Sequence, residues 1–222
     1  MIRLAGFDVS TQSIVYLWYV WRFPRIRNKF CMLQISKGMN ITSFFEEGYK
    51  QLKDTKLLLG LFHETDAANI PEIIAEADML NKYIEENEIE VDLPLFLSWQ
   101  DYDDTKQNKG YPFSKDNNTA MTEAFCKRIK MPVGVKAPMG WLDVGLEYDV
   151  ITQYPVWNVE EGKVDNFCGS IWQYAEQRSI RGNMVGGDYM YLPDDDSYDK
   201  LMAKHEKLVE RYLQRVKGTC NS

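Results

Sequence analysis

Eight short apolar runs, separated by stretches with helical spacing, constrain the fold of this chain more than any other feature of its sequence. Short apolar runs that alternate with helical patterns are typical of βα units around a parallel sheet. Eight strands are also the number that closes a TIM-type barrel. The pattern therefore predicts an α/β fold with a single (β/α) barrel. The predicted strands are residues 4–9, 30–35, 57–62, 93–97, 133–137, 156–159, 170–174 and 184–189.

The clearest helix signal follows the third predicted strand. Asn69 is a suitable N-cap and Pro71 fits the first turn. Apolar residues at helical spacing then mark one face of the helix. Residues 43–52 and 119–129 predict two further helices, and the polar stretch 101–118 predicts a long loop after the fourth strand. Loops at the carboxyl ends of barrel strands are where sites are built.

The end of the chain predicts one more helix, at residues 197–217, after the acidic run 194–196. We expect a barrel over residues 1–192 and a C-terminal helical extension over residues 193–222. The extension either packs on the barrel or projects from it. Packed, it caps the barrel; projecting, it offers a surface for self-association or docking.

Composition excludes several classes of function. The chain has 222 residues, 45% of them hydrophobic, which is enough for a large core. A net charge of −7 disfavours nucleic acid, because polyanions require a basic surface. The four cysteines lie far apart without a CxxC pair, and there are only two histidines. We therefore expect neither a metal site nor a cofactor.

The N-terminal stretch predicts no targeting signal. Asp8 stands where a signal peptide would need apolar residues, and the apolar run 14–21 is too short to span a bilayer. We expect no membrane partner. The localisation stays open among a cytoplasmic protein, a phage-delivered protein, and a processed or excised domain.

Several blocks of sequence resemble, in order, the family 25 glycoside hydrolases. These are bacterial and phage lysozymes that cut the bond between N-acetylmuramic acid and N-acetylglucosamine in peptidoglycan. The resemblance covers about residues 4–191 and implies a barrel of that family's type, with the extra C-terminal helix outside it. It also implies a substrate groove at the carboxyl ends of the strands and a partner that is peptidoglycan or a related glycan. The blocks are GFDVS, KFCMLQISKG, FFEEGYKQLKDTKLLLGLFH, EADMLNKYI, LPLFLSWQDYDD, AFCKRIKMPVGVKAPMGWL, YPVWNVEE and IWQYAEQRSIRGNMVGGDYMYL.

Glycoside hydrolysis requires a proton donor and a second group that acts as base or stabilises the oxocarbenium-like transition state. By resemblance, the catalytic carboxylates on the first and last strands correspond to Asp8 and Asp188. The Asp-x-Glu of the fourth strand becomes Ser98-Trp99-Gln100. Residues two apart on a strand face the same way, so Ser98 and Gln100 are both expected to face the groove. An amide has no acidic proton, and losing a general acid lowers the rate by about two to four orders of magnitude.

The resemblance also implies a set of groove-lining residues. Lys136 stands where the family commonly has a tyrosine, and Gln34 departs from the family's arginine-bearing segment. Any single aromatic residue among them is more often part of the core, and a lone histidine is more often structural. The expected substrate-binding residues are His63, Glu64, Trp99, Lys136, Trp172 and Tyr174.

Three hypotheses follow for the function. The first is a lysozyme-like protein that binds glycan but has weakened or lost muramidase activity. The second is an active cell-wall glycosidase with relocated carboxylates, drawn from Asp8, Asp188 and Glu64. The third is a non-catalytic scaffold that binds a partner. A separate explanation for Gln100 is that it was introduced deliberately to trap substrate, although Ser98 does not fit a single trapping change.

Overall fold

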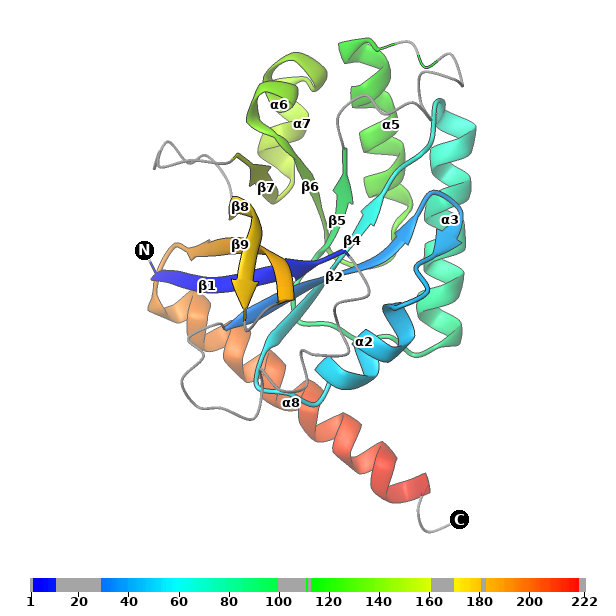
Figure 1. The fold of residues 1–222 in the computed structure, drawn as a ribbon. Coiled ribbons are helices and arrows are strands. Elements are labelled where there is room, and N and C mark those ends of the chain that lie inside the picture. The colour runs from blue at the N-terminus through cyan, green and yellow to red at the C-terminus, as the bar shows by residue number, and fades with distance from the viewer. Residues whose placement is uncertain are drawn as a thin grey trace.

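The computed structural model describes residues 2–10, 29–99, 111, 113–160, 170–180 and 183–219. Its strands form one sheet in the order β1-β9-β8-β7-β6-β5-β4-β2-β3, and β1 also pairs with β2. This last pairing closes eight strands into a barrel and leaves β3 as an addition at the edge (Figure 1). The strands are β1 (Ile2–Val9), β2 (Phe30–Lys37), β3 (Asn40–Ile41), β4 (Leu58–Glu64), β5 (Leu95–Ser98), β6 (Val133–Pro138), β7 (Val156–Val159), β8 (Ile171–Ile180) and β9 (Asn183–Leu192).

All eight predicted strands are present, but the barrel is mixed and not wholly parallel. Strand β9 runs antiparallel to both β8 and β1, whereas the other neighbouring strands of the barrel pair in parallel. Only two residues separate the end of β8 from the start of β9. A connection of that length joins antiparallel strands, because a parallel crossover needs a dozen residues or more. The expectation of a parallel sheet is corrected at this hairpin.

The described helices mostly lie outside the barrel, where α2, α3 and α5 cover one side (Figure 1). The predicted cap of α3 is confirmed, because the Asn69 side chain accepts a hydrogen bond from the Glu72 backbone N–H at 3.0 Å. Helix α5 starts inside the predicted loop, since Ser114 caps it through the Asn117 N–H. Helices α6 and α7 were not predicted. The bounds are α2 (Phe45–Leu52), α3 (Ile70–Glu86), α5 (Lys115–Arg128), α6 (Met139–Gly145), α7 (Tyr148–Gln153) and α8 (Asp195–Thr219).

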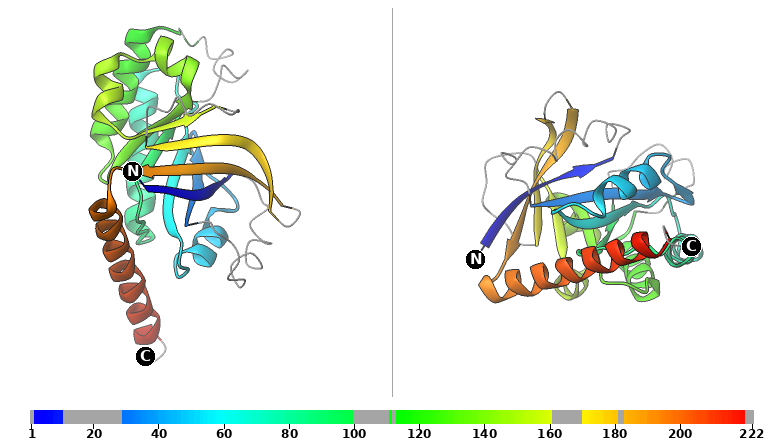
Figure 2. Two further views of the ribbon diagram at one scale, coloured as in Figure 1. Left: turned by 90° about the vertical axis from the view of Figure 1, so that its left-hand side faces the viewer. Right: turned by 90° about the horizontal axis from the view of Figure 1, so that it is seen from below.

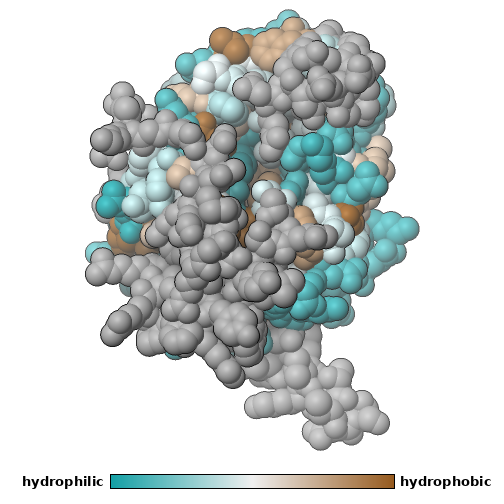
Figure 3. Space-filling view, in the orientation of Figure 1, coloured by the Kyte–Doolittle hydropathy of each residue, from teal (hydrophilic) through white to brown (hydrophobic). Residues whose placement is uncertain are grey.

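The alternation of side chains along the strands creates two separate cores. The larger core lies between the sheet and the helices. The smaller core fills the barrel, where the rings of Phe62 and Phe96 meet Trp157 edge-on with centroids 5.5 and 5.6 Å away. The outward face of the helix layer is polar, and Figure 3 shows hydrophilic residues over α2 and α3. The carboxyl ends of the parallel strands form the end of the barrel that we call the mouth. The polar groups at the mouth lie next to this inner core.

Helix α8 runs across the end of the barrel opposite the mouth (Figure 2, right). Leu201 and Met202 pack against the inner core, and the Lys204 ammonium donates to the Asp92 carbonyl at 2.6 Å. Farther along, Arg211 forms an ion pair with Glu90 at 2.8 Å. These contacts attach the first part of the helix to the barrel, and its C-terminal end extends past the other elements (Figure 1). Among the helices in the described part of the chain, none is long and apolar enough to cross a membrane.

Candidate active site

Each strand of the closed barrel carries one polar or indole-bearing side chain toward the interior, and the one indole, that of Trp157, is also part of the inner core. Four of them follow from register, because Glu64 on β4 is level with Ser98 on β5, which is level with Lys136 on β6, which is level with Trp157 on β7. All eight side chains are buried. This ring is the candidate active site. Its members, in order around the barrel, are Asp8, Gln34, Glu64, Ser98, Lys136, Trp157, Gln173 and Asp188.

Asp8 lies at the end of β1 with both carboxylate oxygens occupied. Oδ1 accepts a hydrogen bond from Gln173 Nε2 at 2.6 Å, and Oδ2 lies 3.4 Å from Lys136 Nζ. Gly186 lies opposite Asp8 on β9, and a Cβ atom there would come within 1.5 Å of Asp8 Oδ1. The absence of a side chain at position 186 therefore makes room for the Asp8 carboxylate.

Asp188 on β9 lies deeper and is 0% exposed. Its Oδ1 accepts a hydrogen bond from the Trp157 indole at 3.1 Å. Burial, and next the nearby Asp8 carboxylate, raise the pKa of Asp188 well above its usual value, although Lys136 and the indole act in the opposite direction. The protonated form of Asp188 is therefore favoured relative to that of an exposed aspartate, while Asp8 pairs with Lys136.

The two positions where the resemblance places an acidic pair, 98 and 100, come at the end of β5. Ser98 is buried and lies on the same face of the strand as the inner-core residue Phe96, so its hydroxyl faces the barrel interior as expected. Gln100 lies outside the described residues. Among the described residues level with Ser98 on the adjacent strands, the acidic one is Glu64. Glu64 accepts a hydrogen bond from Gln34 Nε2 at 3.2 Å and forms an ion pair with Lys37.

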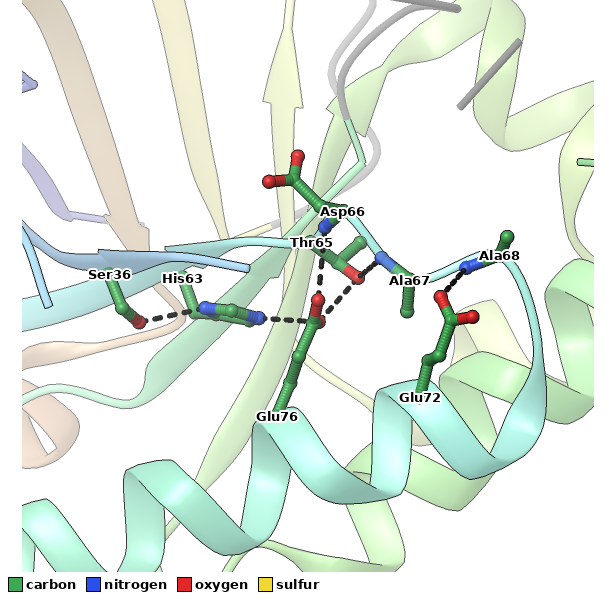
Figure 4. A network of polar contacts seen from close by, with 8 residues as sticks. All are labelled: Ser36, His63, Thr65, Asp66, Ala67, Ala68, Glu72 and Glu76. Atoms are coloured by element: carbon green, nitrogen blue, oxygen red, sulfur yellow. Dashed lines mark hydrogen bonds and ion pairs between the residues drawn. The ribbon is translucent and has the colours of Figure 1, made fainter. Parts of the chain in front are cut away.

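His63 lies on the other face of β4 from Glu64, which corrects its predicted place in the groove. It is 0% exposed, and its ring stacks on Phe125 of α5 at 5.5 Å. Its Nδ1 lies 2.8 Å from Ser36 Oγ and its Nε2 lies 2.9 Å from Glu76 Oε2, so both ring nitrogens have partners (Figure 4). A histidine that faces the helices in this way cannot contact a glycan at the mouth.

Glu76 of α3 extends this network to the segment that follows β4. It accepts hydrogen bonds from Thr65 Oγ1 at 2.6 Å and from the Asp66 backbone N–H at 3.2 Å (Figure 4). The network therefore fixes the end of the strand that carries Glu64. Glu76 was not predicted as a functional or structural residue, although a charged residue on the apolar face of a predicted helix indicates a buried partner.

The three predicted aromatic contacts also lie away from the carboxylates. Trp99 is buried, donates from its indole to Thr122 Oγ1 at 3.0 Å and stacks on Trp141 at 4.9 Å, so it belongs to the packing between the barrel and the helices. Trp172 and Tyr174 flank Gln173, whose side chain points inward to Asp8. Both rings pack around Tyr189 on the outer face of the β8–β9 hairpin. Their predicted position inside the groove is therefore corrected.

Two members of the ring were not among the site residues predicted from the sequence. Gln173 orients Asp8, and Trp157 donates to Asp188 and lies against Lys136. Alternation along the strands contained the signal, because Gln173 lies two residues beyond the apolar Ile171 on the same strand. In the described part of the chain, no cluster of three or more His, Cys, Asp or Glu residues could hold a metal ion.

Comparisons with known proteins concern the fold. The sequence matches no protein-family model and none of the curated proteins. Among solved structures, the modular autolysin LytC from Streptococcus pneumoniae, in complex with a synthetic peptidoglycan ligand, is similar with a TM-score of 0.73 and 14% identity over 85% of this chain. The match covers 47% of LytC, so this chain spans about half its length.

Two further structures match over nearly their whole length. A family 25 glycosyl hydrolase from Bacillus anthracis has a TM-score of 0.63 and 15% identity, covering 89% of this chain and 92% of its own. The bacterial lysozyme from Streptomyces coelicolor has a TM-score of 0.60 and 15% identity, covering 92% of this chain and 98% of its own. The closed mixed barrel described above is therefore a family 25 lysozyme fold.

Proposed function

We propose that this chain is a lysozyme-like protein that binds a peptidoglycan-type glycan at the barrel mouth and has weakened or lost muramidase activity. The observation that carries the proposal is the position of Ser98, level with Glu64 and Lys136 and facing the interior. A hydroxyl stands there in place of the expected aspartate. Gln100 replaces the expected glutamate in the sequence, and an amide cannot act as a general acid.

The two remaining family carboxylates do not supply the missing acid. Asp188 has a raised pKa, but it is 0% exposed, so its carboxyl group cannot reach a glycosidic oxygen at the mouth. Both carboxylate oxygens of Asp8 are already occupied, one by Lys136 and the other by Gln173. The ring therefore offers a base or a stabilising charge without an accessible acid from either residue.

A glycan of the peptidoglycan type is the partner that the fold favours. LytC has the same fold and has been solved with a synthetic peptidoglycan ligand. The experiment is co-sedimentation of the purified chain with insoluble peptidoglycan, followed by measurement of newly formed reducing ends in the same tubes. We expect retention that soluble peptidoglycan fragments compete away, with few or no new reducing ends. Absence of retention would favour the third hypothesis, a scaffold for another partner.

An active glycosidase is the second candidate, and Glu64 is the observation that favours it. This carboxylate is level with Ser98 and is held by Gln34 and Lys37 at the mouth. If wild-type protein releases reducing ends, Glu64→Gln is expected to lower that rate by about two orders of magnitude or more. Glu86→Gln, on an exposed carboxylate of α3, is the control and should leave the rate unchanged.

A further inference from the structure

The Lys136 side chain occupies a site built to hold a positive charge. Its ammonium lies 3.7 Å from the centroid of the Trp157 ring and 4.3 Å from that of Phe62. Asp8 Oδ2 lies 3.4 Å away. Aromatic faces and a carboxylate are the groups that bind cations in proteins. In this chain the cation is its own lysine, only 8% of whose side chain is exposed.

The surrounding charges make this ammonium the counterion of Asp8. Gln173 is neutral and Asp188 cannot carry a positive charge, so neither of these two neighbours neutralises Asp8. On the other side of Ser98, Glu64 is paired with Lys37. Each anionic carboxylate of the described ring thus has a lysine partner, which leaves none free to attract a cation from solution.

We propose that Lys136 is a specificity-determining residue: a resident cation that fills the position beside Asp8 and makes the groove select against positively charged ligands. This inference rests on the proposed function, because it concerns the same groove. A glycosidase transition state develops positive charge on the sugar, and a carboxylate stabilises it. With Lys136 in place, the charge of Asp8 is already neutralised by the lysine ammonium, so Asp8 stabilises an additional positive charge on a ligand less.

The first test requires no glycan. Lys136→Ala removes the ammonium and its stem, and propylammonium has the size and charge to replace them. We expect propylammonium to raise the melting temperature of Lys136→Ala more than the same concentration of 1-propanol does, and to have no such effect on wild-type protein. In Asp8→Asn/Lys136→Ala the advantage of the cation over the alcohol should disappear.

Equal effects of propylammonium and propanol on Lys136→Ala would overturn the proposal. If Lys136→Ala does not fold by itself, the yield of folded protein on refolding with each additive gives the same comparison. Lys136→Arg and Lys136→Met provide a matched pair, because only arginine keeps a cation. We expect Lys136→Arg to melt closer to wild-type protein than Lys136→Met does, and the reverse order would also count against the proposal.

The second test uses two glycans and separates this inference from the proposed function. Tri-N-acetylglucosamine is neutral, whereas triglucosamine carries ammonium groups. Relative to wild-type protein, Lys136→Met should shift the ratio of their affinities toward the cationic sugar by about tenfold. Asp8→Asn/Lys136→Met should show no such shift. Failure of every protein to bind either sugar would contradict glycan binding, and the propylammonium result would still decide the role of Lys136.

Discussion

At the scale of single residues, the barrel mouth separates two carboxyl groups by environment. Asp8 has a lysine and an amide as partners, whereas burial and the charge of Asp8 raise the pKa of Asp188. Two nearby carboxyl groups disfavour each other's ionisation, so the proximity of Asp8 adds to the effect of burial on Asp188. The sequence predicted both aspartates by resemblance. It could not predict the raised pKa of Asp188, because this depends on Trp157, on Lys136 and on the depth of Asp188 in the barrel.

The raised pKa of Asp188 predicts a pH-dependent loss of stability. Because the folded state holds a proton that the unfolded chain releases above about pH 4, the free energy of unfolding should fall as pH rises from there toward the folded pKa, by at most about 1.4 kcal/mol per pH unit. Asp188→Asn cannot ionise and should lose less stability than wild-type protein as pH rises above about 4. Urea unfolding at several pH values measures this difference.

Asp194 provides a control of opposite sign. Hydrogen bonds from the Ser197 side chain and backbone lower the pKa of Asp194. Its contribution to stability is therefore present above the usual pKa of aspartate and is lost as pH falls. Asp194→Asn should flatten the acidic side of the profile and leave the neutral side unchanged. Wild-type and Asp188→Asn curves that run parallel would contradict the raised pKa of Asp188.

The close approach of Gly186 to Asp8 predicts a second residue-scale effect. A methyl group at position 186 would lie within 1.5 Å of Asp8 Oδ1 and 2.4 Å of Gln173 Nε2. Gly186→Ala should therefore displace Asp8 and destabilise the protein by about 3 kcal/mol. Gly140→Ala, with no atom within 4 Å of the added methyl group, is the control and should show no loss. Thermal unfolding of the two variants measures the contrast, and equal stabilities would show that the β9 backbone adapts freely.

At the scale of elements, α3 is joined to the barrel by the hydrogen bonds of Glu76. Glu76→Ala would leave His63, Thr65 Oγ1 and the Asp66 N–H without their buried acceptor, which should cost about 3 kcal/mol. Glu86→Ala, at an exposed position of the same helix, should change stability by less than about 0.5 kcal/mol. Urea denaturation compares the two. Similar losses would mean that the network contributes nothing beyond helix propensity.

Local sequence signals predicted the helices and strands better than they predicted how the strands pair. Asn69 and Pro71 located the start of α3, because a cap acts through adjacent residues. The direction of β9 depends instead on the two-residue connection to β8, which the prediction of repeated βα units did not take into account. The alternation of side chains along a strand correctly predicted that Ser98 faces the barrel interior. The faces of His63, Trp99, Trp172 and Tyr174 followed from the same alternation, and their assignment to the groove by resemblance ignored it.

At the scale of the whole molecule, α8 covers the barrel end opposite the site. We propose that residues 193–222 act as a cap, because Leu201 and Met202 pack on the inner core and Lys204 binds the Asp92 carbonyl. Removing residues 195–222 should expose that core and lower the melting temperature by several degrees. Lys200→Ala, on an exposed side chain, should not. An unchanged melting temperature after truncation would favour the alternative, a helix for self-association, which light scattering on both proteins would detect.

We propose that the residues at positions 98 and 100 limit hydrolysis in an otherwise lysozyme-like barrel. Reducing-end release from purified peptidoglycan, measured side by side for wild-type protein and Ser98→Asp/Gln100→Glu, decides whether they do. We expect little or no release by wild-type protein and a rate at least about a hundredfold higher in the double variant. Wild-type release as fast as that of the double variant, abolished by Asp8→Asn, would show that positions 98 and 100 do not limit hydrolysis.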